Sequence, residues 1–359
     1  MVRIVKRTGV TKTQSVYFRL LAVLLALVSS GVFILILGHN PLDVYKAMLK
    51  GAFGNMYGFK ETIILAIPLV VTSLGIAVAF KMKFWNIGAE GQIFMGAFAA
   101  SFFALQFPNL PRPVLLIVMA VAGIIGGGLW ALVPAIFKAQ FGTNETLFTL
   151  MMNYIALKWV TYLQYGPWRD PKANGFPQIA SFSDNATLPR LFGIHIGWVI
   201  ALILIAVMYI FIHYTKKGYE IAVIGESENT ARYAGMNVKK IVVTAILLSG
   251  GLCGLAGMIQ ASGVNGTLSV DVSGGVGYTA IITTWLGQLS APIILVVSFL
   301  FAVLVQGGAY IQTVFQIPQA AASLLQGMIL FFVLGSEFFI QYKLVIKKVL
   351  THKLEKEGI

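Results

Sequence analysis

A small number of polar side chains interrupt the long apolar runs of this chain, and their types could do chemistry. Amide, hydroxyl and carboxylate groups in apolar surroundings cost free energy unless they face a cavity or a partner. Glu90 could therefore line a path or gate, or it could belong to a cap at the start of a helix. Asn144 and Glu145 could likewise line a path, or cap the helix that follows them. The candidate path residues are Asn86, Glu90, Gln92, Asn144, Asn153 and Tyr154.

The patterns typical of catalytic and metal sites are missing from the sequence. The dipeptide Gly-Lys never occurs, so the chain has no P-loop of its own, and there is no H-E-x-x-H pattern. The four histidines are scattered, and Cys253 is the only cysteine. We therefore expect no catalytic residue, no metal site and no cofactor bound by this chain, and predict that it is not an enzyme.

The composition is that of an integral membrane protein. Of the 359 residues, 58% are hydrophobic and 11% are charged, and the mean hydropathy is +0.83. A soluble domain carries roughly 25% charged residues. The net charge of +13 could suggest nucleic acid, but the Lys and Arg residues cluster between apolar runs. That distribution is typical of membrane topology, and no nucleic-acid partner is expected.

Ten apolar segments can be drawn, most of them long enough for a helix to cross a bilayer. They are residues 18–37, 61–80, 87–106, 113–137, 144–165, 196–214, 241–262, 276–288, 292–312 and 319–340. The eighth is short and contains glycine at its start, so it could be broken or re-entrant. The sequence predicts an all-α polytopic membrane protein with about ten transmembrane helices in a single domain, 1–359.

The positions of the basic residues predict the orientation. Lys and Arg are more frequent in the segments that lie inside when the N-terminus is inside, and ten spans return the C-terminus to the same side. Both termini, the loop 215–240 and the basic tail 341–359 are then cytoplasmic, and the loop 166–195 is external. Glycine-bearing stretches follow the second and seventh spans, which suggests that spans 2–5 and 7–10 are inverted copies.

The loop 215–240 is a polar, charged interruption in an otherwise apolar chain. Its middle predicts a short surface helix, with Glu226 and Glu228 in the first turn and Arg232 four residues after Glu228. Gly235 stands where a left-handed helix stop belongs. The loop could be a solvated linker between two spans, or a surface that docks a soluble partner.

The source of energy can be narrowed from what the spans contain. Proton-coupled carriers use chains of buried Asp, Glu and His, and no such chain is visible here. Sodium sites built from carbonyl groups leave an ion-coupled carrier open as an alternative. The other energy source for uphill transport is a separate ATPase. Such an ATPase needs a rigid cytoplasmic element of the membrane domain to bind, and residues 226–235 are the best candidate.

Four stretches carry a resemblance to a known family. They are FWNIGAEGQ (84–92), NETLFTLMMN (144–153), GESENTARYAGMNV (225–238) and LSGGLCGLAG (248–257). With these motifs the chain resembles, from about Glu61 to Glu337, the permease subunit of bacterial ABC importers of the simple-sugar and nucleoside class. Ribose and branched-chain amino acid permeases are related. The first two motifs are most similar to those of nucleoside permeases that work with a lipoprotein receptor.

One stretch departs from the family pattern. The family usually has G-x-G-F-[DE]-G-I-A-V-A-L-L-G, whereas residues 275–287 here read GVGYTAIITTWLG. The acidic residue is missing, and Thr283, Thr284 and Trp285 are unusual. If this stretch faces the path, the substrate preference could differ from that of the family's best-known members.

The resemblance implies an assembly and a location. It implies a second permease subunit, with a heterodimer expected, two cytosolic ABC ATPase domains that use ATP, and an external substrate-binding lipoprotein, in the inner membrane of a bacterium. Nucleosides are the expected substrate, and a monosaccharide such as ribose is the alternative. The residues implied in coupling to the ATPase are Gly225, Glu226, Glu228, Arg232, Tyr233, Ala234 and Gly235.

Overall fold

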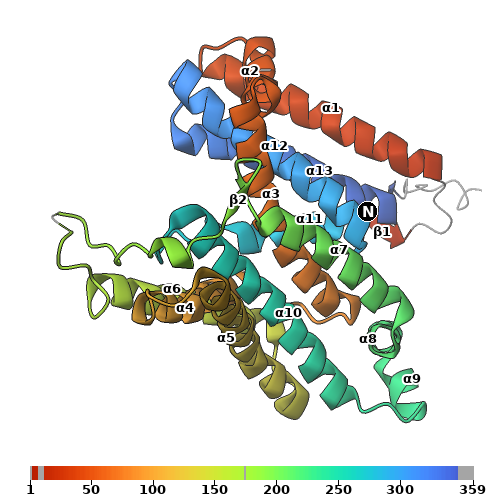
Figure 1. Ribbon diagram of the computed structural model, residues 1–359. Helices are drawn as coiled ribbons and strands as arrows, with labels where there is room; N and C mark the ends of the chain where they lie inside the picture. The colour runs from red at the N-terminus through yellow and green to blue at the C-terminus, as the bar shows by residue number, and fades with distance from the viewer. Residues whose placement is uncertain (1, 7–11, 174, 347–359) are drawn as a thin grey trace, which may run out of the picture. The chain divides into compact units, whose positions relative to one another are not determined.

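The computed structural model describes residues 2–6, 12–173 and 175–346, which are mostly helical (Figure 1). Each of the ten apolar segments coincides with a helix, which confirms the helical class. These helices are α1 (Lys12–Ile36), α3 (Met56–Lys81), α4 (Ala89–Gln106), α5 (Arg112–Phe141), α6 (Glu145–Tyr165), α7 (Gly197–Tyr214), α10 (Val238–Gln260), α11 (Val276–Leu286), α12 (Ala291–Phe315) and α13 (Gln319–Gln341).

Fewer than ten of these helices are long and apolar enough to cross a membrane alone. In the described part of the chain there are six: α3, α5, α7, α10 with its extension to Asn265, α12 and α13. A seventh span results if α1 and α2 (Pro41–Phe53), which are bent by 110° relative to each other, count as one broken span. Helix α11 has only 11 residues. The structure therefore does not confirm ten complete spans.

The contacts divide the chain into two compact units, residues 1–51 with 307–359, and residues 52–306. In the first unit, strand β1 (Val2–Lys6) pairs antiparallel with β4 (Tyr342–Ile346), and the predicted tail therefore begins as a strand. The rest of that tail, 347–359, lies outside the described residues. The single domain expected for 1–359 stays a prediction.

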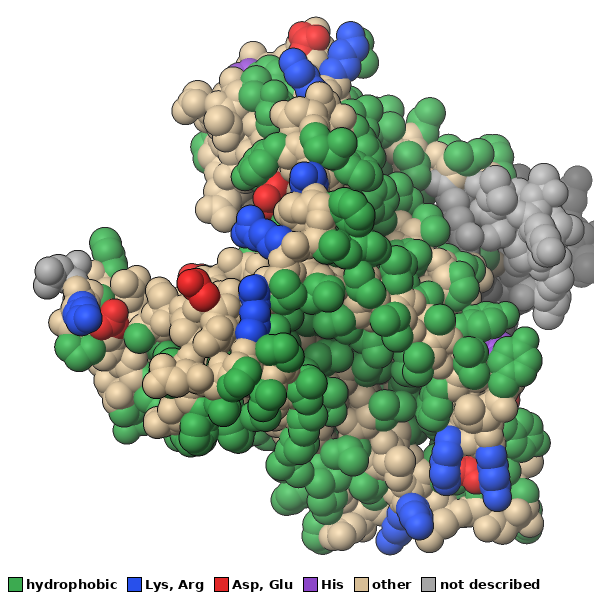
Figure 2. All heavy atoms as spheres, in the orientation of Figure 1, with side chains coloured by type: hydrophobic (Ala, Val, Ile, Leu, Met, Phe, Trp, Pro, Cys, Tyr) green, Lys and Arg blue, Asp and Glu red, His purple; other side chains and the backbone are tan. Residues whose placement is uncertain are grey.

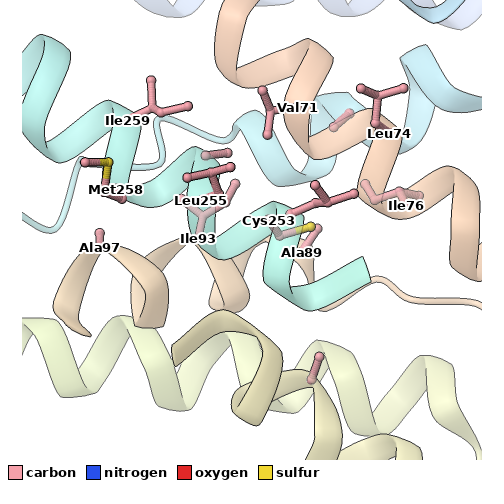
Figure 3. Packing of buried hydrophobic residues seen from close by; sticks show 14 of the residues in the cluster. Val71, Leu74, Ile76, Ala89, Ile93, Ala97, Cys253, Leu255, Met258 and Ile259 are labelled. Carbon is pink, nitrogen blue, oxygen red and sulfur yellow. The ribbon is translucent and has the colours of Figure 1, made fainter. Parts of the chain in front are cut away.

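The second unit is built around α10, which packs on α3, α4 and α5 (Figure 3). Its buried surface is apolar and includes Val71, Ile93, Leu255 and Ile259. Helices α5 and α10 approach closely because glycines face each other. A Cβ on Gly254 would lie 2.1 Å from the Gly123 carbonyl oxygen, so backbones meet where side chains usually separate helices. Glycines of the stretches 123–128 and 250–257 thus allow these two helices to pack closely.

The second half of the loop 166–195 is bound to the C-terminal extension of α10, which consists of the single-turn π-helix η2 (Ala261–Asn265) and the residues directly after it. The Phe182 N–H donates to the Gly266 carbonyl at 2.8 Å, and the Leu188 N–H donates to the Ser262 carbonyl at 3.1 Å. The loop ends in a turn η1 (Asp184–Ala186) and a hairpin of β2 (Arg190–Leu191) and β3 (Ile194–His195). It is thus a packed element, although its external location stays a prediction.

Candidate functional site

Two helices begin at the same place in the second unit. The start of α11 lies against the start of α4, so closely that a Cβ on Gly277 would be 2.4 Å from the Glu90 nitrogen. Each helix follows a non-helical stretch that contains glycine, 82–88 before α4 and 266–275 before α11. Helix N-termini expose unpaired N–H groups and carry partial positive charge, so two of them together require acceptor groups from elsewhere.

Glu90 supplies acceptors to the start of α11. Its Oε1 accepts from the Ser273 hydroxyl at 2.6 Å and from the Gly275 N–H at 3.1 Å. Its Oε2 accepts from the Gly277 N–H at 2.7 Å. The Glu90 residue is only 6% exposed, so these charge-assisted bonds replace the hydration that the carboxylate loses.

Asn153 of α6 supplies an acceptor to the start of α4. Its Oδ1 accepts from the Gly91 N–H at 2.8 Å, and its Nδ2 donates to the Ile87 carbonyl at 2.9 Å. The same Nδ2 lies 3.4 Å from the Tyr278 hydroxyl of α11. Asn153 thus connects α6, α4 and α11 at one point.

Asn86 and Gln92 form a second, fully buried network behind this point. The Asn86 Nδ2 donates to the Gln92 Oε1 at 3.1 Å and lies 3.2 Å from the Ser249 hydroxyl of α10. The Gln92 Nε2 donates to the Asn86 Oδ1 at 3.0 Å. These two predicted path residues hold the stretch before α4 in place, and the protein surrounds them.

A polar pocket of about 250 Å³ opens in front of the two helix starts. Three of the predicted path residues line it: Glu90, Asn153 and Tyr154. The sequence reasoning missed its other polar members, Asp271, Ser273 and Tyr278. Asp271 and both tyrosines are exposed, so the pocket offers an exposed carboxylate and two aromatic rings to a small molecule. The sequence signal that could have indicated this part of the pocket is the pair Gly274-Gly275 directly before α11. Both glycines have a positive φ in the structure.

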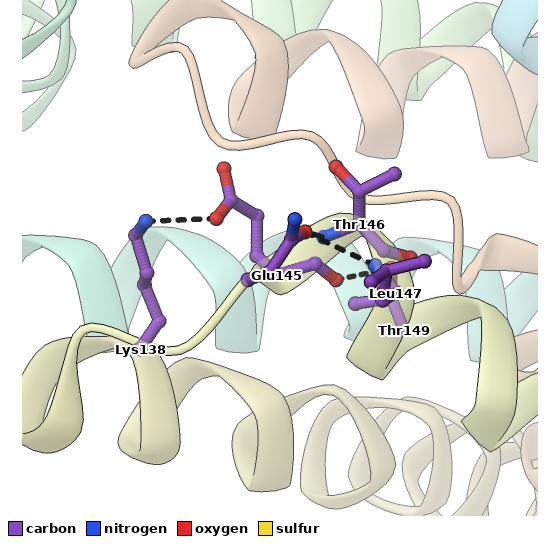
Figure 4. A network of polar contacts seen from close by, with 6 residues as sticks. Lys138, Glu145, Thr146, Leu147 and Thr149 are labelled. Carbon is purple, nitrogen blue, oxygen red and sulfur yellow. Dashed lines mark hydrogen bonds and ion pairs between the residues drawn. The ribbon is translucent and has the colours of Figure 1, made fainter.

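Asn144 does not lie in this pocket. It is the N-cap of α6, where its Oδ1 accepts from the N–H groups of Thr146 at 3.0 Å and Leu147 at 3.2 Å. Glu145 follows it and forms an ion pair with Lys138 at 2.8 Å, as Figure 4 shows. The capping interpretation therefore accounts for both residues.

Two of the residues in the unusual 275–287 stretch face a neighbouring helix. Thr283 and Thr284 are fully buried. The Thr284 hydroxyl donates to the Ser73 carbonyl of α3 at 3.1 Å, and the Thr283 hydroxyl bonds the Ser73 hydroxyl. Trp285 is partly exposed and stacks on Trp85, with ring centroids 5.5 Å apart. The threonines thus fasten α11 to α3 and do not line the pocket.

The polar segment after α7 forms two helices, α8 (Lys216–Glu226) and α9 (Glu228–Tyr233). The expected Glu228–Arg232 ion pair is present at 2.6 Å, and Gly235 has φ of +74°. The placement of Glu226 was wrong. It ends α8, because Ser227 caps a new helix by accepting from the Thr230 N–H at 3.2 Å.

The predicted coupling residues divide into an exposed and a buried group. The exposed group contains Glu226, Glu228, Arg232, Tyr233, Ala234 and Gly235, with Tyr233 94% exposed. Gly225 is buried against the end of α3, and a Cβ on it would lie 1.9 Å from the Lys81 carbonyl oxygen. The exposed face of α9 is thus fixed to α3 through α8.

Comparisons with known proteins identify the family. The model of a family described as "Branched-chain amino acid transport system / permease component" matches residues 58–334. The chain is 32% identical to the glucose ABC transporter permease protein TsgB13 of Haloferax volcanii, over 91% of this chain and 89% of that one. It is 29% identical to the nucleoside ABC transporter permease protein NupB of Lactococcus lactis, covering 97% and 98%. It is also 29% identical to the guanosine ABC transporter permease protein NupP of Bacillus subtilis, covering 94% and 96%. The resemblance seen in the sequence motifs is confirmed, and the chain belongs to this family of ABC transporter permease components.

Proposed function

We propose that this chain is a permease subunit that imports nucleosides, and that its polar pocket forms part of the translocation path. The observation that carries the proposal is the pocket at the adjacent N-termini of α4 and α11. Asp271, Tyr154 and Tyr278 line this pocket together with Glu90. Discontinuous helices whose N-termini meet near the middle of the membrane are a common way to build a substrate site in transporters.

The chemistry of the pocket suits a nucleoside. A nucleobase is flat and stacks on aromatic rings, as those of Tyr154 and Tyr278 allow. Ribose hydroxyls donate hydrogen bonds, and the exposed Asp271 carboxylate accepts them. A pocket of about 250 Å³ is slightly smaller than typical ligand sites, which suits a path that holds its substrate weakly.

Two of the relatives that cover nearly all of this chain are named for nucleosides or guanosine. The FWNIGAEGQ motif points in the same direction. The alternative substrate is a monosaccharide such as ribose, and the relative named for glucose favours this class. Aromatic rings and a carboxylate also suit a sugar, so a transport measurement must separate the two. The family favours an ATPase-driven permease over the ion-coupled carrier.

We further propose the assembly in which this chain works. It pairs with a second permease, in a heterodimer that works with two cytosolic ATPase domains, and one of these domains binds the exposed face of α9. An external lipoprotein delivers the substrate. Both termini face the cytoplasm of a bacterium, and ten spans cross its inner membrane, with spans 2–5 and 7–10 as inverted copies. ATP-driven closure of the ATPases moves α9 and rocks the two permeases between outward-open and inward-open states.

Uptake by the reconstituted complex tests the function. Labelled guanosine should be taken up with ATP, and excess unlabelled nucleoside should compete while excess ribose or glucose should not. Asp271→Asn should raise the half-saturating nucleoside concentration. Asp43→Asn, the same change on the exposed start of α2, is the matched control. Uptake of sugar alone would overturn the nucleoside assignment.

ATP hydrolysis tests the docking surface separately. Replacement of Arg232 and Gly235 by bulky acidic residues should abolish substrate-stimulated ATP hydrolysis, because both lie on the exposed face of α9 and its end. Normal hydrolysis in that variant would refute the proposed docking, whichever substrate is carried.

A further inference from the structure

The second unit has an apolar groove that the proposed transport path does not use. It lies between α5, α7, α8 and α10, and its volume is about 390 Å³. The α10 wall is formed by residues three or four apart, which share one helix face: Ile241, Ala245, Leu248, Leu252 and Leu255. Ile124, Leu204 and Phe211 complete the apolar lining.

One end of this groove is basic. Lys217 lines it from the start of α8. Lys240 precedes the lining residue Thr244 by four positions, so it continues the groove-facing row of α10 by one turn. Both lysines are exposed. Figure 2 shows basic side chains gathered over the end of this unit where α8, α9 and the start of α10 lie in Figure 1.

From this combination we propose that the groove binds an anionic phospholipid, with one acyl chain along α10 and the headgroup phosphate at Lys217 and Lys240. Lys217 already pairs with Glu220 at 2.7 Å. An ammonium group has three donors, so two remain for a phosphate oxygen. No ion pair is recorded for Lys240 within the described chain. Basic pockets between membrane helices at the cytoplasmic surface are suited to anionic headgroups.

A lipid fits this groove better than a soluble ligand. Helices α5, α7 and α10 are candidate membrane spans, and only 22% of the apolar window of α7 is buried in the protein. The groove is therefore open to the hydrocarbon, where acyl chains are the abundant partners. Lys217 of α8 and Lys240 of α10 place two positive charges at one end of the groove, and an anionic headgroup complements them.

Native mass spectrometry of the full-length chain tests the proposal with phosphatidylglycerol and phosphatidylcholine of equal chain length. Wild-type protein should retain phosphatidylglycerol preferentially. The double variant Lys217→Gln/Lys240→Gln should bind it more weakly by about fivefold per lysine. The matched control is Lys216→Gln/Lys239→Gln, which removes the same charge from the same two helices one residue away from the groove positions. It should change the affinity less than about twofold.

A third variant tests the apolar part of the site without changing charge. Thr244→Trp places a large ring in the groove and should reduce the binding of both lipids, while circular dichroism confirms that the helices remain folded. Equal affinity of wild type for the two lipids would overturn the proposal. So would equal losses in the two double variants, full binding by Thr244→Trp, or a groove found closed by a second copy of the chain.

Discussion

Glu90→Gln is the sharpest test of how the pocket is held together. The carboxylate accepts hydrogen bonds from three donors of the 273–277 stretch, two of them backbone N–H groups. A glutamine keeps the size of the side chain but offers one acceptor oxygen and an amide nitrogen that only donates. The substitution therefore changes hydrogen bonding and charge and leaves the packing almost unaltered.

The magnitude follows from the geometry. If the glutamine carbonyl accepts from the Gly277 N–H, the glutamine NH₂ group faces the other two former donors. The Ser273 hydroxyl can rotate and accept a hydrogen bond from this NH₂ group. The Gly275 N–H can only donate, so it faces another donor. The Gly275 N–H, which is half-buried, then loses its partner, at a cost of about 1–3 kcal/mol. Loss of the negative charge at the start of α11 costs about 0.3–2 kcal/mol more. The local opening free energy of α11 should fall by about 2–4 kcal/mol.

Hydrogen–deuterium exchange of the purified chain measures that quantity. Amides of α11 should exchange at least about tenfold faster in Glu90→Gln, since each 1.4 kcal/mol is a factor of ten. Glu145→Gln is the control, because it makes the same change in the first turn of α6. Its partner Lys138 is 39% exposed, so that change should cost under about 1 kcal/mol and leave α11 unaffected.

Two results would refute the reasoning. Unchanged exchange in α11 would mean that the carboxylate does not stabilise the helix start. Equal acceleration in all helices would mean that Glu90 supports the whole unit and that no local anchor exists at the pocket.

Three further predictions concern other parts of the second unit. Burial lowers the pKa of His195 to about 4 from 6.5, and both ring nitrogens lack a hydrogen-bond partner. As the pH falls, His195 is therefore protonated in the unfolded chain before it is protonated in the folded chain. The free energy of unfolding should fall by up to about 3 kcal/mol as the pH drops from 6.5 to 4. Melting temperatures should show this slope in wild type and in the exposed control His213→Leu, and His195→Leu should lack it. Gly254→Val should prevent folding or insertion, because its Cβ would meet backbone atoms of α5, whereas Gly327→Val, with open space at its Cβ, should behave as wild type in expression and gel filtration. Gly225→Ala should leave the chain folded by circular dichroism but reduce ATP-driven uptake more than ATP hydrolysis, because α8 must move away from Lys81. Equal loss of both activities would contradict that role.

The helices could be predicted from the sequence because hydrophobicity extends over many consecutive residues and needs no knowledge of partners. Their ends were less certain. Helix α3 begins at Met56 and α5 ends at Phe141, several residues beyond the apolar runs. Polar residues at a membrane surface can remain helical, and only a specific stop such as Gly142, with φ of +66°, ends α5.

The pocket could be predicted only in part. Glu90 and Asn153 were recognisable because isolated polar groups in apolar surroundings are costly. Asp271 and Ser273 lie in an ordinary polar loop. Ser273 reaches the pocket through its hydrogen bond to Glu90, more than 180 residues away in the sequence, and Asp271 lines the same pocket. No local pattern carries that information. The error over Glu226 is of another kind, because Ser227 is a readable N-cap and indicates that a new helix starts after it.

The proposed coupling segment, residues 215–240, and the pocket both contact the same short stretch of chain, residues 81–90. Gly225 of α8 lies against the Lys81 carbonyl at the end of α3. From there the chain runs through Lys83, which has a left-handed φ of +58°, to Asn86 and Glu90. A non-glycine residue in this conformation is strained and is held by its surroundings. A movement of α8 would therefore act on the stretch 82–88, and through Glu90 on the start of α11. This is a contiguous physical connection, and it explains why a buried glycine in the coupling segment should affect a pocket that it does not line.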